Sequence, residues 1–132
     1  MNAISLHFIF FQNVSQSGHL DKLPVDIAES AAEGPVQPRL KVYPVRSFLE
    51  KQKGRSFQSS WYDKYSWMEY SVSFDRIYCF PCRFFGNTAT HQETQFTRDG
   101  FINWKKIHDK CAKHEAGTAH TNAFTKWLNY QQ

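Results

Sequence analysis

The chain has 132 residues, which is room for one domain with a core of modest volume. Aromatic residues make up 17% of it, a share typical of a packed interior and not of a disordered chain. Residues 1–38 hold one Lys and four acidic residues, a net charge of −3, whereas residues 39–132 hold 15 Lys and Arg and 8 acidic residues, a net charge of +7. The basic part suits a polyanion such as nucleic acid, and an ordinary basic surface explains it equally well.

The three cysteines, two of them in a C-x-x-C, indicate a reducing compartment, because an odd count without secretory context speaks against a disulfide framework. The apolar run over residues 6–11 lacks a basic leading region and a cleavage site, and it is far shorter than the roughly 20 residues of a membrane span. We therefore expect neither a signal peptide nor an anchor there. Residues 12–38 are small and polar and predict a linker, so we divide the chain into a poorly ordered segment, 1–38, and a folded domain, 39–132.

The first regular elements are expected from an aromatic segment onwards. The spacing of Phe57, Trp61 and Tyr65 predicts a short helical turn. The dense cluster that continues from it could be core or could be a surface for a protein partner, and we favour core because the domain has little other apolar material. The residues of this cluster are Trp61, Tyr62, Tyr65 and Trp67.

A β-hairpin is predicted next. Met68, Tyr70 and Val72 alternate with polar residues, which is the period of a strand with one buried face. A turn at residues 75–76 and a second strand over 77–80 complete the hairpin, and its far end carries the C-x-x-C.

Two helices are predicted after a polar loop over residues 86–99. Apolar and His side chains recur on one face of the first helix, and Gly117 is placed to end it. Thr118 is placed to cap the second helix, which also has an apolar face. The two faces comprise Trp104, Ile107, Cys111 and His114, then His120, Phe124, Trp127 and Leu128. The sequence therefore predicts an α+β fold, a small zinc-bound domain with a β-hairpin zinc knuckle followed by two helices.

Four side chains of this layout can converge on one metal ion. Zn²⁺ prefers four nitrogen and sulfur ligands in a tetrahedron. Cys79 and Cys82 on a tight turn, with His114 and His120 at the junction of the two helices, supply such a set. A redox role for the C-x-x-C needs a βαβ context that the sequence lacks. Cys111 stays open as a replacement for His120, since it lies one helical turn before His114.

The same residues carry a family resemblance. The matching blocks are Arg55–Phe57, Trp61–Tyr62, Tyr65–Ser71, Asp75, Tyr78–Phe85, Gly100–Lys105 and His114–His120. Together they resemble the TTF-type zinc finger of hAT-type transposases and of transposon-derived proteins, including zinc finger MYM-type proteins. The resemblance implies zinc ligation by Cys79, Cys82, His114 and His120, lowers the weight of Cys111, and implies DNA binding in the nucleus. We expect the chain to lack the catalytic region that follows the finger in those relatives.

Three functions follow from these patterns. We favour a zinc-dependent DNA-binding module, whose phosphate contacts we assign to basic residues around the knuckle, the loop and the first helix. Those residues are Arg83, Arg98, Lys105, Lys106, Lys110 and Lys113. The alternative is a zinc-stapled protein-interaction module in a nuclear protein. An enzyme comes last, because four candidate ligands leave no open metal position; we expect no small-molecule substrate and no membrane partner.

Overall fold

The computed structural model describes residues 22–47, 53–87 and 93–132, and the apolar run over residues 6–11 lies outside these ranges. The strands form two antiparallel hairpins: β1 (Val45–Arg46), β2 (Arg55–Ser56), β3 (Met68–Ser71) and β4 (Arg76–Cys79). The helical elements are α2 (Trp61–Lys64), α3 (Phe80–Phe85), the π-helix η1 (Gln95–Asp99), the 3₁₀ helix η2 (Trp104–Lys106), α4 (Ile107–Ala116) and α5 (Thr118–Tyr130). The predicted α+β class, with a central hairpin followed by two helices, is confirmed.

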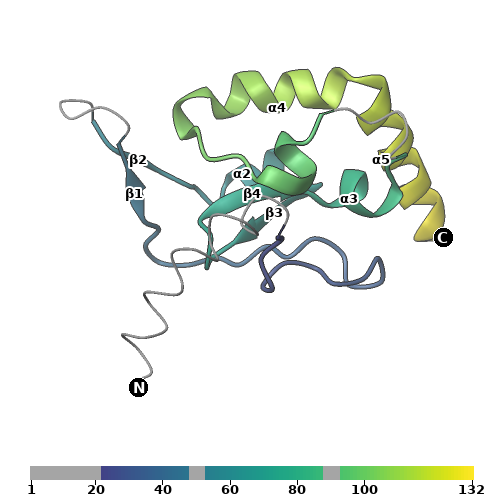
Figure 1. Ribbon diagram of the computed structural model, residues 1–132, viewed down its shortest axis with the longest axis horizontal. Helices are drawn as coiled ribbons and strands as arrows, with labels where there is room; N and C mark the ends of the chain where they lie inside the picture. The colour runs from purple at the N-terminus through teal and green to yellow at the C-terminus, as the bar shows by residue number, and fades with distance from the viewer. Residues whose placement is uncertain (1–21, 48–52, 88–92) are drawn as a thin grey trace.

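The β3–β4 hairpin lies at the centre, with α4 above it and α3 packed against α5, while β1–β2 projects from the opposite end (Figure 1). Its register pairs Met68 with Cys79 and Ser71 with Arg76. The predicted period of two is wrong in one respect, because all four residues of β3 are buried and Val72 is 44% exposed. Both faces of this strand are covered, so its polar residues are buried as well.

One face of β3 is covered by residues 22–38, a segment in which we expected little order. Ile27 and Ala28 are buried. The backbone amides of Ala28 and Val36 donate to the Glu69 carboxylate at 3.1 and 3.3 Å, and the Tyr70 amide donates to the Val36 carbonyl at 3.0 Å. This segment therefore packs on the domain, and the predicted boundary at residue 39 does not mark where packing begins. The rest of the predicted linker, up to residue 21, lies outside the described residues.

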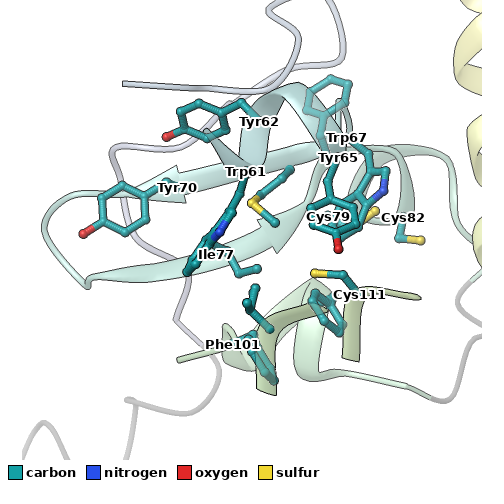
Figure 2. Packing of buried hydrophobic residues seen from close by; sticks show 14 of the residues in the cluster. Trp61, Tyr62, Tyr65, Trp67, Tyr70, Ile77, Cys79, Cys82, Phe101 and Cys111 are labelled. Carbon is teal, nitrogen blue, oxygen red and sulfur yellow. The ribbon is translucent and has the colours of Figure 1, made fainter. Parts of the chain in front are cut away.

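The aromatic cluster between the hairpin and the helices is core. Phe57 stacks on Tyr70 with ring centroids 4.2 Å apart and contacts Trp104 edge-on at 5.9 Å. All four residues of the predicted cluster are at most 7% exposed: Trp61, Tyr62, Tyr65 and Trp67. Figure 2 shows how side chains from the hairpin and from the helical layer meet there. The cluster thus serves packing and offers little surface to a partner.

Gly117 separates α4 from α5, as predicted, but the capping differs. Its φ and ψ of −76° and 148° are extended, and it precedes the first helical residue, Thr118, which was expected to be the cap. Leu128 is 46% exposed and does not share the buried face of α5, whereas Trp127 does. The sharp junction at Gly117 brings the end of α4 and the start of α5 together, and this places two histidines side by side.

Candidate metal centre

The two cysteines sit at a strand-to-helix junction. Cys79 is the last residue of β4, and Cys82 lies in the first turn of α3. Pro81 occupies the first turn of this helix, where its missing N–H costs no hydrogen bond. The Phe80 amide donates to the Trp67 carbonyl at 2.9 Å, which ties the junction to the neighbouring strand. The predicted knuckle therefore turns from a strand into a short helix, and both thiols face the same point.

The histidines come from the other side of the domain. His114 lies in the last turn of α4 and His120 in the first turn of α5. Because Gly117 breaks the helical path between them, the two rings approach each other, with His114 Nε2 and His120 Nδ1 3.1 Å apart. The four side chains predicted as a set thus come together from β4, α3, α4 and α5, with ligand atoms all within 4.8 Å of one another.

The separations match those of a tetrahedral zinc site. Zn–S and Zn–N bonds of about 2.3 and 2.0 Å place neighbouring ligand atoms roughly 3.3–3.8 Å apart. Cys79 Sγ and Cys82 Sγ lie 3.4 and 3.5 Å from His120 Nδ1, and Cys82 Sγ lies 3.6 Å from His114 Nε2. With the pair of histidine nitrogens, four of the edges of a tetrahedron lie near the expected length. The donor set and its spacing therefore fit a zinc ion.

Burial and mutual contact shape the acidity of the two thiols. The contact with Cys79 is the main cause that lowers the pKa of Cys82, and the two imidazoles lower it further against the effect of burial. Burial raises the pKa of Cys79 well above its ordinary value. Cys82 is 4% exposed, and the side chain of His114 is 5% exposed. The cluster thus favours thiolate at Cys82, and a divalent cation would favour it at both cysteines.

Aromatic rings enclose the histidines. Trp67 contacts the rings of His114 and His120 at centroid distances of 5.1 and 5.3 Å, and Phe96 stacks on His114 at 4.4 Å. The Trp67 indole N–H donates to a Glu115 carboxylate oxygen at 2.7 Å, which holds the indole in place. These rings restrict the access of water to the cluster.

Glu93 was missed by the sequence analysis. Its carboxylate approaches His114 Nδ1, the nitrogen turned away from the cysteines, to 3.6 Å, and it also accepts from the Phe96 amide at 2.9 Å. A carboxylate behind a histidine ligand commonly orients the ring. The only sequence signal was an acidic residue in a polar loop, which does not specify a partner.

Cys111 stands apart from the cluster. It is fully buried in the hydrophobic core and does not belong to the group of four side chains that the described residues bring together. Burial raises the pKa of its thiol, with a further contribution from the negative charge of Glu115. The structure therefore groups His120, and not Cys111, with the other three side chains.

Arg83 does not lie on the surface where a phosphate contact was expected. Its side chain is 8% exposed and forms an ion pair with the buried Glu69, while a second nitrogen donates to the Ala28 carbonyl at 3.0 Å. Because the guanidinium of Arg83 is paired with the buried carboxylate of Glu69, it is not presented to a phosphate. The remaining predicted contact residues are exposed or, for Lys110, half-buried: Arg98, Lys105, Lys106, Lys110 and Lys113.

Comparison with known proteins adds one relationship. The chain is 27% identical over 90 residues to zinc finger MYM-type protein 5 of Macaca fascicularis and 26% identical over 90 residues to that of Homo sapiens. Each alignment covers 61% of this chain and 13% of the relative, so the chain spans a small part of the proteins it matches. No family model matches the chain, and no solved structure matches it significantly.

The fold, the site and this homology support a zinc-finger module. The chain is a small α+β protein whose Cys₂His₂-type cluster could bind a metal. Within the described residues, none of the helices has the length and apolar character needed to cross a bilayer.

Proposed function

We propose that Cys79, Cys82, His114 and His120 bind one structural Zn²⁺ ion and that the domain so held binds DNA in the nucleus. The observation that carries the metal assignment is the near-tetrahedral spacing of one donor atom from each residue. Four protein ligands complete the coordination of zinc, so the ion stabilises the fold and has no open position for catalysis. On this proposal the chain is not an enzyme.

The basic residues of η2 and α4 support DNA as the partner. Lys105, Lys106 and Lys113 are exposed on the outer side of this helical segment, opposite the buried Trp104, Ile107 and Cys111. Lys113 lies 4.0 Å from Asp109, but both side chains are more than half exposed, so this ion pair holds the lysine weakly. Cations displayed in this way can contact phosphates, and such contacts raise the affinity for DNA without specifying its sequence.

Zinc stoichiometry tests the metal assignment. Native mass spectrometry of the full chain should show one zinc, which is lost in His120→Ala and retained in Cys111→Ala. Cys111→Ala is the matched control, because it truncates a buried residue of the same helical layer outside the cluster. Loss of zinc in Cys111→Ala with retention in His120→Ala would move the site to a Cys₃His set.

Salt-dependent binding tests the DNA assignment. Fluorescence anisotropy with a 20-base-pair duplex should show an affinity that falls steeply with KCl concentration. The triple variant Lys106→Ala/Lys110→Ala/Lys113→Ala should lower the slope of log affinity against log salt by about 2.7. Absence of salt-dependent binding in the zinc-loaded wild type would overturn DNA binding and favour a protein-interaction module.

A further inference from the structure

The β1–β2 hairpin is a second basic element, held firmly at its base. Arg46 donates to the Asp75 carboxylate at 2.7 Å and to the Phe74 and Asp75 carbonyls at 3.3 and 3.2 Å. Asp75 also accepts a hydrogen bond from the Tyr70 hydroxyl. These contacts fix the start of a hairpin that projects away from the β3–β4 sheet (Figure 1).

The described residues of the hairpin and of the segment that leads into it carry positive charge only, while residues 48–52 add one acidic residue and one lysine, Glu50 and Lys51. Residues 39–47 and 53–56 contain five cations and no acidic side chain. Arg39 pairs with Asp63 and Arg46 pairs with Asp75. The other three cations are exposed and form no ion pair with a described residue: Lys41, Lys53 and Arg55.

The hairpin is continuous with the lysines of the helical layer. Phe57 follows β2 directly and packs against Trp104, the first residue of η2, so β2 lies against η2. Lys105 and Lys106, which follow Trp104 in η2, are exposed, and α4 continues from there for ten residues, or ~15 Å. Exposed cations thus lie on β2, on η2 and, at Lys113, in the last turn of α4.

We propose that the β1–β2 hairpin binds the phosphate backbone of duplex nucleic acid, with Lys53 and Arg55 contacting phosphates beside those bound by η2 and α4. This inference rests on the proposed DNA-binding function. Cations on two elements that diverge from one junction match a long polymer with regularly spaced charge, such as a duplex with one charge per ~1.7 Å, better than a small anion. A guanidinium on a fixed strand also suits the geometry of a phosphate.

The test compares two double variants of the full, zinc-loaded chain on the same 20-base-pair duplex. Lys53→Ala/Arg55→Ala should lower the salt slope by about 1.8 and weaken binding evenly across unrelated duplexes. The control Lys22→Ala/Lys126→Ala changes the net charge equally but lies outside the hairpin, η2 and α4, and it should leave the slope near that of the wild type. Lys53→Arg/Arg55→Lys, which keeps both charges, should also retain the slope.

The outcomes separate this inference from the function on which it rests. An unchanged slope in Lys53→Ala/Arg55→Ala, with a reduced slope in the triple variant of Lys106, Lys110 and Lys113, would overturn the hairpin contact and leave DNA binding standing. Equal losses in the control double variant would also overturn it, because net charge alone would then explain the effect. Absence of duplex binding in the wild type, with binding of poly-glutamate through the same residues, would overturn both and assign the surface to an acidic polypeptide.

Discussion

Two buried polar clusters lie on neighbouring residues of α3, and they are satisfied in different ways. Cys82 faces the two histidines, whereas Arg83 is paired with Glu69. The first cluster offers four donor atoms to an ion supplied from outside. The second is completed inside the chain, by a guanidinium and by the backbone amides of Ala28 and Val36.

The difference concerns what each cluster needs in order to be stable when buried. Isolated charges are costly in a protein interior, and they persist there only with partners. Burial raises the pKa of Glu69, and Arg83 together with the backbone amides opposes that rise. Among the described residues, the metal cluster has no Lys or Arg paired with its thiols, so we infer that its stability depends on zinc, while that of the Glu69 cluster depends on the segment 22–38.

The largest expected effect is the loss of the fold on metal removal. Structural zinc contributes about 10–16 kcal/mol of apparent binding free energy in zinc-finger peptides, which is as large as the whole stability of a typical domain. A chelator should therefore abolish the near-ultraviolet circular dichroism from the packed aromatic core, and added zinc should restore it. An unchanged spectrum in chelator would contradict the structural role of the ion.

Breaking the internal pair should cost less. Arg83→Ala leaves the fully buried Glu69 without its cation, and we expect the free energy of unfolding of the zinc-loaded protein to fall by about 3–5 kcal/mol. Urea unfolding measures the change. The control is Arg39→Ala, which breaks a pair whose side chains are 54% and 74% exposed and should cost less than ~1 kcal/mol. Equal losses in both variants would mean that Glu69 is satisfied without Arg83.

Removal of the covering segment tests the other half of the Glu69 cluster. The fragment 39–132 lacks the two amides that donate to Glu69, and such hydrogen bonds to a charged group contribute about 1.5–3 kcal/mol each. Since water can replace part of this loss, we expect the fragment to be less stable than the fragment 22–132 by about 2–4 kcal/mol in urea unfolding. Both fragments should retain one zinc. Equal stability of the two would show that residues 22–38 pack without stabilising the domain.

The grouping of the four metal-binding candidates could be predicted from the sequence, whereas the environment of Glu69 could not. Cys and His residues have few plausible roles in a protein of this kind, and metal ligands recur at characteristic spacings. The break at Gly117 also indicated that two helices meet there. Glu69 is one of the polar residues that alternate with Met68, Tyr70 and Val72, and such an alternation predicts a solvent-facing side chain. Its real partners include backbone amides of residues 28 and 36, and backbone groups have no sequence signature. Arg83 was likewise assigned to the surface, because its contacts with Glu69 and with the Ala28 carbonyl have no sequence signature either.

The hairpin pairing of β3 with β4 was predictable from periodicity and from the turn at Asp75, where φ is +54°. The short pair β1–β2 was not, since two residues per strand carry no period. The sequence likewise did not indicate that position 100 requires glycine, although its φ is +87° and an added Cβ would lie 2.7 Å from Arg76 Cδ. Such features depend on tertiary contacts, which single-sequence patterns do not record.

The smallest expected effect distinguishes Cys111 from the cysteines of the cluster. Because burial raises the pKa of Cys111, the folded protein keeps a proton that the unfolded chain loses above its ordinary pKa of about 8.5. The folded state then binds more protons, so the free energy of unfolding should fall by about 1.4 kcal/mol for each pH unit above ~8.5 relative to Cys111→Ala. Below ~8.5 the difference between the two proteins should not change with pH.

Urea unfolding of zinc-loaded wild type and Cys111→Ala between pH 7 and 10 measures this difference. A difference that rises with pH up to about 8.5 and is constant above it would mean that Cys111 is a thiolate in the folded protein, as a metal ligand must be. That result would reopen the assignment of Cys111 to the zinc site. A decline that begins near pH 8.5 would instead identify Cys111 as a neutral thiol of the core, which is the state that burial among apolar side chains favours.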